Sequence, residues 1–417
     1  MKLNKKLFAG VMTSVLALSG MGGLAKADAA DVELTINYYH GAISDAAIEA
    51  AKKEFPDWKL NFTMQPASDD FDTKLRASLN SKSAADITAI NSNIQDFKPY
   101  YEKFVNLAEY GSMDHKDDFV AWKWDSTLAE DGKYQMAFPL DIGPTALQYN
   151  KAAFEKAGLP TDPEEVSEKI KTFDDLMAAA KDLKEKAEIP MFRGIHDVFV
   201  PYCQGMTERV FNEKGELTFA NGQLKEAWDY AIEAHKNGYI LNVRGNTGES
   251  VNATGEGLYG ASIMASWGIA DLRDAGVKKE QWLVAKAPGN PSNNGGSYLA
   301  AIGTTEHPKE AAELIMFLTS EDSQKLNYEG NALFPTRNSL FNDEFLAIKD
   351  EALFGDYEFN KYFVESAKEL KYLPLDVRES AALKCFEDQL QLVVDQDKDP
   401  DKAWEEAVKN AEQVAKQ

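Results

Sequence analysis

The segment at residues 139–151, which reads PLDIGPTALQYNK, constrains the fold of this chain more than any other stretch. Two prolines and a glycine lie in its first half, and because proline fixes φ and lacks a backbone N–H, no helix can run through it. Residues 145–149 then have the composition of a short strand, and Asn150 is a suitable N-cap for a helix at residues 151–157. A proline-bounded extended segment in mid-chain, carrying a single acid at Asp141, suits a strand that crosses between two lobes.

Three motifs along the chain resemble the interlobe crossovers of bacterial extracellular solute-binding proteins, the sugar-binding receptors of ABC importers that include maltose-binding protein. The first is the segment just described, continued by a helix start at residues 172–176. The second is GGSYLA at residues 295–300, followed by a helix that begins near residue 307, and the third is FPTR at residues 334–337. Their order and spacing agree with the family over residues 32 to 415.

The resemblance implies an α/β chain with the two-lobed periplasmic-binding fold, in which doubly wound sheets are joined by three crossovers. It implies an N-terminal lobe at residues 28–141 plus 295–335 and a C-terminal lobe at residues 142–294 plus 336–417. A carbohydrate, either a mono- or an oligosaccharide, would bind between the lobes and stabilise the closed form by contacting both. The closed protein, expected to be a monomer without cofactor or metal, would then dock on a membrane-embedded ABC transporter permease.

Residues 1–27 have the three parts of a secretory signal peptide. Early lysines form a positive n-region, the apolar run at residues 7–18 is too short to span a bilayer, and Ala25-Lys26-Ala27 is an Ala-x-Ala cleavage site. Met21 stands where a lipoprotein signal would have cysteine, so we expect no lipid anchor. The sequence therefore predicts cleavage after Ala27 and an extracytoplasmic protein, periplasmic or secreted. An N-terminal amphipathic helix is the alternative.

The N-terminal part of the mature chain alternates between strands and helices. Strands are expected at residues 32–39, 58–64 and 85–90, and helices at residues 46–54 and 70–79. This order implies a parallel, doubly wound sheet, on which ligands bind outside the carboxyl ends of the strands. Those ends carry amides and aromatic rings that suit a polyhydroxylated ligand, and from them we select Tyr38, Tyr39, His40 and Asn91. Because successive strand residues point to opposite faces, a core position is the alternative for either tyrosine.

Three tryptophans further along the chain are candidates to stack on a sugar ring. Trp122 and Trp124 lie two positions apart, so they cannot share one helix face. We expect one of them in the core and the other able to reach the cleft. Trp267 ends a strand-like stretch at residues 261–265, where the family often presents an aromatic side chain to the sugar. A packed core tryptophan is the alternative for Trp267.

Three crossover residues complete the predicted site. Asp141 lies where the chain should pass between the lobes, and a carboxylate there can accept two hydrogen bonds from adjacent hydroxyls. The alternative is a hinge salt bridge, for example with Arg337 of the third crossover. If Arg337 does not pair with Asp141, it could bind a hydroxyl or an acidic group of the ligand, or pair with another carboxylate across the lobes. Tyr298 of the second crossover is the remaining candidate.

Charge and motif content exclude several other functions. The net charge of −23 argues against nucleic acid and against anionic membrane surfaces, which need basic patches. Cys203 and Cys385 are too few for a disulfide framework, although a single bridge between them stays open. The acidic run that begins at Asp395 imitates a calcium loop, but its sixth position is Pro400, where the turn needs glycine. Asp399 as an N-cap with Pro400 in the first helical turn explains this run without a metal.

Catalysis is the main rival to binding. No H-E-x-x-H, G-x-S-x-G or P-loop motif occurs, and G-x-G-x-x-G at residues 255–260 does not follow a strand, so a nucleotide site is rejected. The 68 acidic residues, however, are enough to supply a pair of glycosidase carboxylates. A secreted glycoside hydrolase or lyase is therefore the alternative function. A structural surface protein would show repeats or low-complexity stalks, and the sequence has neither.

Overall fold

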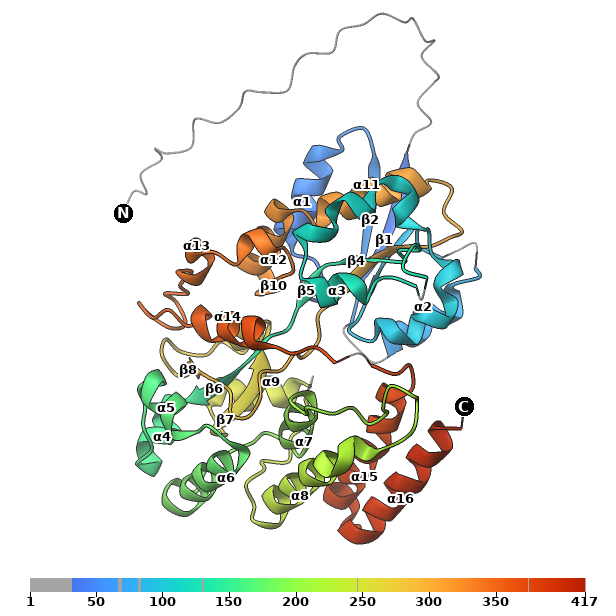
Figure 1. The fold of residues 1–417 in the computed structure, drawn as a ribbon. Helices are drawn as coiled ribbons and strands as arrows, with labels where there is room; N and C mark the ends of the chain where they lie inside the picture. Colours follow the sequence, from blue (N-terminus) through green and yellow to red (C-terminus); the bar gives the residue numbers. More distant parts are fainter. Residues whose placement is uncertain are drawn as a thin grey trace, which may run out of the picture.

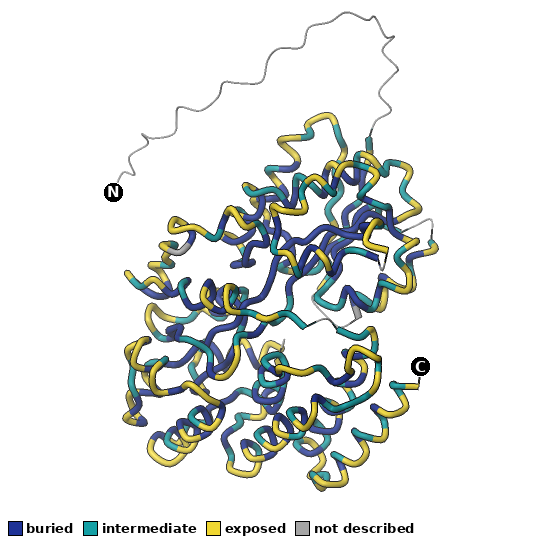
Figure 2. The backbone as a smooth tube through the Cα atoms, in the orientation of Figure 1, coloured by how far each residue is buried: buried dark blue, intermediate teal, exposed yellow. Residues whose placement is uncertain are grey.

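The computed structural model describes residues 32–66, 70–81, 84–129, 131–245, 247–373 and 375–416. The predicted signal peptide lies outside the described residues. The described chain is an α/β protein of two lobes, each with a sheet at its centre and helices around it (Figure 1). Figure 2 shows the buried backbone concentrated at the centre of each lobe and along the chain segments that connect them.

The N-terminal lobe contains a five-stranded sheet in the order β2-β1-β3-β9-β4. Its strands are β1 (Glu33–Tyr39), β2 (Lys59–Gln65), β3 (Ile87–Ile90), β4 (Phe138–Pro139) and β9 (Tyr298–Ala301). Strand β1 pairs in parallel with β2 and β3, as the β-α-β-α-β order predicts. Strand β9 runs antiparallel to both β3 and β4, so the parallel arrangement predicted for the first three strands is confirmed and the complete sheet is mixed.

Helices pack on this sheet through their apolar faces. They are α1 (Asp45–Glu54), α2 (Asp70–Ser78), α3 (Ala121–Asp125), α11 (Pro308–Leu318) and α12 (Glu321–Asn331). Helix α1 begins where the Ser44 side chain accepts a hydrogen bond from the Ala47 N–H, and it buries Ala47, Ile48 and Ala51. These residues join strand side chains such as Leu34 and Ile36 in one core cluster, which therefore holds α1 on the sheet.

The C-terminal lobe contains a three-stranded sheet in the order β7-β6-β8. Strand β6 (Thr145–Asn150) pairs antiparallel with both β7 (Ala261–Ala265) and β8 (Trp282–Ala285). The parallel arrangement predicted for the first three strands of the chain does not extend to this sheet. Strand direction here depends on pairing between segments far apart in sequence, which local patterns do not encode.

Helices surround this sheet and extend the lobe. They are α4 (Lys151–Ala157), α5 (Pro163–Lys169), α6 (Phe173–Asp182), α7 (His196–Gln204), α8 (Gln223–Lys236), α9 (Gly248–Glu256), α10 (Gly268–Asp274), α13 (Asp343–Leu346), α14 (Asn360–Glu369), α15 (Glu379–Gln396) and α16 (Pro400–Val414). Asn150 caps α4, and Asp399 caps α16 with Pro400 in its first turn, both as predicted. Helix α9 and Gly257 precede β7, so no strand leads into the glycine motif there.

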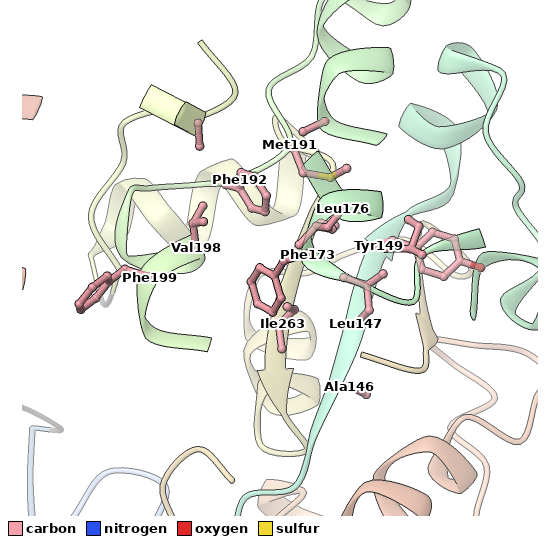
Figure 3. Packing of buried hydrophobic residues seen from close by; sticks show 14 of the residues in the cluster. Ala146, Leu147, Tyr149, Phe173, Leu176, Met191, Phe192, Val198, Phe199 and Ile263 are labelled. Atoms are coloured by element: carbon pink, nitrogen blue, oxygen red, sulfur yellow. The ribbon is translucent and has the colours of Figure 1, made fainter. Parts of the chain in front are cut away.

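Large apolar side chains fill the centre of the C-terminal lobe. Leu147 of β6 lies opposite Ile263 of β7 in the strand register. Figure 3 shows these two side chains beside Phe173 and Leu176 of α6. Burial of such side chains contributes about 1.5–3 kcal/mol each relative to full exposure, so this cluster fixes α6 on the sheet.

Three segments cross between the lobes, in agreement with the predicted fold. The first continues from β4 into β5 (Asp141–Ile142), and the third contains β10 (Phe334–Pro335). These two strands pair antiparallel with each other. The second crossover leads into β9, and its Ser297 carbonyl accepts a hydrogen bond from the Leu140 N–H at 3.0 Å. The crossovers therefore run side by side and are bonded to one another.

The core clusters divide near these crossovers. One cluster contains buried residues from positions 34–140 and 299–318, and another contains residues from positions 142–285 and 328–411. The predicted lobe limits at residues 141/142, 294/295 and 335/336 stay predictions.

Candidate functional site

A cavity of about 1030 Å³ lies between the two lobes. From the N-terminal lobe it is lined by α2, the segment after β3, Trp122 of α3 and Tyr298 of β9. From the C-terminal lobe it is lined by the end of α7 and the loop after it, the loop before Gly295, and the chain from α14 into α15. This hollow, bounded by both lobes, is therefore the candidate binding site.

Amide side chains dominate the N-terminal wall. Asn91, Asn93 and Gln95 follow β3 directly and all line the cavity, so the carboxyl end of this strand faces the cavity. The Asn91 side-chain oxygen accepts a hydrogen bond from the Ser92 N–H at 2.7 Å, which fixes that amide. Arg76 and Asp96 form an ion pair at 3.6 Å along the same wall.

The C-terminal wall is stabilised by charged groups that bond to backbone. The guanidinium of Arg209 donates to the Leu373 carbonyl from Nε at 3.3 Å and from Nη2 at 3.1 Å. Glu379, at the start of α15, accepts from the Val210 N–H at 2.8 Å and the Phe211 N–H at 3.3 Å. Burial raises the pKa of Glu379, and these two N–H groups oppose that rise. These bonds hold the loop after α7 against the segment that leads into α15.

The two neighbouring tryptophans separate as predicted. Trp124 is completely buried, and its ring packs against those of Phe119 and Phe138 in the N-terminal core. Trp122 is only partly buried and lines the cavity. Its ring lies nearly parallel to that of Tyr372, with 4.6 Å between ring centroids and 11° between ring planes. Trp122 is therefore the tryptophan that a ligand can reach.

Asp141 lies in a buried polar cluster at the crossovers and not in the cavity wall. Its Oδ1 accepts a hydrogen bond from the Ser297 N–H at 2.7 Å and a second from the Ser297 hydroxyl. The side chain is 2 % exposed, and burial raises its pKa while the charge of Lys123 opposes the rise. Lys123 is 1 % exposed, and burial lowers its pKa to about 7 against the opposing charge of Asp141. These contacts favour the hinge role for Asp141, with Lys123 and Ser297 as its partners in place of Arg337.

Arg337 lies away from the described cavity wall. Its Nη1 pairs with Asp118 at 2.9 Å, its Nε donates to the Thr319 carbonyl at 2.9 Å, and its guanidinium lies 4.3 Å from the centre of the Phe119 ring. Arg337 thus pairs with a carboxylate from the N-terminal part of the chain, which was the structural alternative for this residue.

Comparison with known proteins assigns the family. A family model described as bacterial extracellular solute-binding protein matches residues 46–355. The chain belongs to this extracellular solute-binding family. No curated protein matches the chain.

Several solved structures share the fold of this solute-binding protein. A protein described as extracellular solute-binding protein family 1 is 25% identical with a TM-score of 0.78, over 92% of this chain and 100% of that chain. An ABC substrate-binding protein from Listeria monocytogenes, solved with cycloalternan, is 18% identical with a TM-score of 0.75, over 93% of this chain and 99% of that chain. A binding protein from B. animalis subsp. lactis, solved with β-1,6-galactobiose, is 18% identical with a TM-score of 0.75, over 92% of this chain and 97% of that chain.

The predicted residues at the end of β1 lie outside the described cavity lining of the solute-binding protein. Tyr38 is 6 % exposed and packs edge-to-face on Phe62 in the core, so the core alternative is correct for it. Tyr39 points to the other side, as strand alternation requires, and its hydroxyl lies near Ser297 and Asp141. His40 is exposed. The chain turns after β1, and this turn directs these side chains toward the hinge and the surface.

Two more predicted site residues lie near the cavity: Tyr298 lines it, and Trp267 lies beside it. Tyr298 lines the cavity, and its hydroxyl lies 2.9 Å from that of Ser126. The Trp267 indole N–H donates to the carbonyl of Asn294, a lining residue, at 3.1 Å. Trp267 is half-buried and belongs to none of the core clusters of the described chain. Its role as a stacking residue stays a prediction.

Sequence reasoning missed the contribution of the chain between α14 and α15. Tyr372 and Glu379 line the cavity, yet this region was expected only to form helices rich in lysine and glutamate. The signal was present: an aromatic residue stands two positions before a proline at the end of a helical pattern, which indicates an extended segment. Lys123 was missed because a lysine beside tryptophan normally stays at the surface.

Three further features are the cysteines, possible metal ligands and possible membrane-spanning helices. Cys203 and Cys385 are both free thiols, so the bridge left open by the sequence does not form. Within the described ranges, histidine, cysteine and acidic side chains form no group of three that could hold a metal ion. In the same part of the chain, each helix is too short or too polar to cross a membrane.

Proposed function

We propose that this protein captures a carbohydrate, either a mono- or an oligosaccharide, between its lobes and delivers it to an ABC transporter permease. The observation that carries the proposal is the interlobe cavity, which combines aromatic rings with amide side chains from both lobes. Aromatic rings cover the apolar faces of sugars, and amides both donate to and accept from hydroxyls. The proposed contacts are Trp122, Tyr298, Asn91 and, at the edge of the cavity, Trp267.

The size of the cavity supports a ligand larger than one sugar ring. Its volume of about 1030 Å³ lies at the upper end of the range for small-molecule sites, about 300–1,000 Å³. Two of the structures that share the fold were solved with cycloalternan and β-1,6-galactobiose, which supports the same ligand class. We therefore place di- and oligosaccharides first in the order of testing.

The protein acts in this proposal as a receptor and not as a glycoside hydrolase or lyase. Several charged groups of the cavity wall already have partners within the protein. Arg76 pairs with Asp96, and Arg209 donates to the Leu373 carbonyl. Glu379 accepts hydrogen bonds from two backbone N–H groups. A carboxylate whose two oxygens each accept a backbone N–H is held away from a glycosidic oxygen.

Export and partner form the last part of the proposal. Residues 1–27 act as a signal peptide cleaved after Ala27, without lipid attachment, and the mature protein works as a monomer outside the cytoplasm. The extracellular description of the family supports the location. The closed form presents both lobes to the permease at once.

A carbohydrate panel tests the proposed function. Differential scanning fluorimetry of the mature protein with mono-, di- and oligosaccharides should find at least one sugar that raises Tm, because a ligand that binds only the folded state stabilises it. Calorimetry should then give one site per chain, and chromatography of the incubated sugar should show no turnover. A panel in which no carbohydrate shifts Tm, or a sugar that is cleaved, contradicts the proposal.

A further inference from the structure

The coil between α14 and α15 runs along the boundary between the lobes (Figure 1). It carries an aromatic ring that contacts the N-terminal lobe. This ring is Tyr372, and it lies face to face with Trp122 of α3, with 4.6 Å between centroids and 11° between planes. The Gln95 side chain, also from the N-terminal lobe, lies near the Tyr372 hydroxyl. One tyrosine thus contacts two cavity-lining residues of the opposite lobe.

The same coil is fastened to the C-terminal lobe on both sides of Tyr372. Upstream it continues from α14, whose Tyr362, Phe363 and Val364 are buried in the core of that lobe. Downstream, the guanidinium of Arg209 holds the Leu373 carbonyl at 3.1 Å. Tyr372 must therefore move with the C-terminal lobe, while Trp122 moves with the N-terminal lobe.

Two further contacts cross at the same place. The Ser380 hydroxyl at the start of α15 donates to the Asn93 side-chain oxygen at 3.3 Å. Trp122 also packs against the core cluster of the C-terminal lobe, although its helix belongs to the N-terminal lobe. The Ser380 bond is a single neutral hydrogen bond, so the stacked rings are the larger of these contacts.

The stack occupies ring surface that a ligand would use. Tyr372 covers one face of Trp122, and both rings line the cavity. A planar apolar face that rests on Trp122 from this side would have to replace Tyr372. Tyr372 therefore makes the same kind of stacking contact on Trp122 that a ligand ring bound between the lobes would make.

We propose that Tyr372 is an internal latch that keeps the lobes together when no ligand is bound. The proposal concerns the ligand-free protein and does not depend on the chemical class of the ligand. If the stack stabilises the closed form, its removal shifts the ligand-free population toward separated lobes, because only an interaction that differs between two states can move their equilibrium.

Small-angle X-ray scattering of the ligand-free mature protein tests this latch. Tyr372→Ala should raise the radius of gyration above that of the wild type. Tyr372→Phe is the matched control: it keeps the ring on Trp122, removes only the hydroxyl, and should scatter like the wild type. Ser380→Ala removes the other crossing hydrogen bond and should also scatter like the wild type.

A second variant keeps the test decisive if Tyr372→Ala does not fold. Trp122→Ala removes the same stack from the opposite lobe, and it should open the protein to the same extent. Circular dichroism identifies which variants are folded. Scattering curves of folded Tyr372→Ala or Trp122→Ala that superpose on the wild type overturn the proposal, as does equal expansion of Ser380→Ala.

Discussion

The ammonium of Lys123 lies 3.5 Å from the centre of the Tyr298 ring. Lys123 is buried in α3, and Tyr298 begins β9 and lines the cavity. A cation over an aromatic face is attracted by the ring, and this attraction is larger when the pair is shielded from water. Lys123 also interacts with the charge of Asp141. One buried lysine thus connects the first crossover, the second crossover and the cavity wall.

Lys123→Met should destabilise the folded protein by about 2 kcal/mol, because it leaves the Asp141 carboxylate buried without its counter-charge. Asp141→Asn in the same chain should recover part of this loss, since the amide does not need a counter-charge. Urea denaturation of the two single variants and the double variant measures the coupling. Purely additive losses would show that Lys123 and Asp141 do not act as a pair.

The stability of the protein should depend on pH through Lys123. Burial lowers the pKa of Lys123 from its usual 10.5 to about 7 in the folded state. Between these two values the unfolded chain binds more protons than the folded one, so the contribution of this group to the unfolding free energy rises with pH over that range. The difference in unfolding free energy between wild type and Lys123→Met should therefore grow in favour of the wild type from pH 7 to pH 9.5. A difference that stays constant with pH contradicts the depressed pKa.

Asp141→Asn alone should affect the hinge more than the ligand. Its Oδ1 accepts two hydrogen bonds from Ser297, and bonds to a charged group contribute about 1.5–3 kcal/mol. The neutral amide should weaken them and lower the Tm of the ligand-free protein. Calorimetry with a sugar found in the panel should give an affinity close to that of the wild type. A large loss of affinity with an unchanged Tm would instead place Asp141 in the binding site.

The pair Trp122 and Trp124 offers matched substitutions. Trp124→Ala should destabilise the fold by about 3–5 kcal/mol, because it empties a fully buried site between Phe119 and Phe138. Trp122→Ala should be less destabilising and should weaken sugar binding by about thirtyfold, equivalent to about 2 kcal/mol. Denaturation and calorimetry of both variants separate the two roles. Equal loss of stability in both would contradict the assignment.

Trp267→Ala should reduce sugar affinity by about tenfold, equivalent to about 1.4 kcal/mol, if the ring stacks on the ligand at the edge of the cavity. Trp267→Phe keeps a ring but loses the N–H that bonds the Asn294 carbonyl, and it should bind nearly as well. Calorimetry distinguishes these outcomes. If the alanine variant binds normally and only its Tm falls, Trp267 supports the loop that ends at Asn294 and does not touch the ligand.

Local sequence rules predicted the helix boundaries well. Asn150, Thr172 and Asp399 each accept a backbone hydrogen bond at the start of a helix, and their short polar side chains identify these positions without any tertiary information. The spacing of Trp122 and Trp124 was equally informative, because a helix must place them on different faces. Resemblance to the family supplied the crossovers and the two lobes.

Local sequence rules could not predict how strands far apart in the sequence pair with one another. The antiparallel direction of β9 depends on where the chain re-enters the sheet, and the direction of β7 and β8 depends on their common partner β6. The candidate site was predicted in part for the same reason. Asn91, Trp122 and Tyr298 line the cavity, whereas Tyr38 and Arg337 contact other parts of the protein that their own sequence neighbourhoods do not reveal.

The position of β9 between β3 and β4 has a consequence for how the chain reaches its native state. Strands β3 and β4 are joined only through β9, which is formed by Tyr298–Ala301. The N-terminal lobe therefore cannot complete its sheet until most of the C-terminal lobe has been synthesised. Contacts of such long sequence separation slow folding, because the entropy of loop closure must be overcome first. A chain truncated before β9 should therefore not acquire a stable N-terminal lobe.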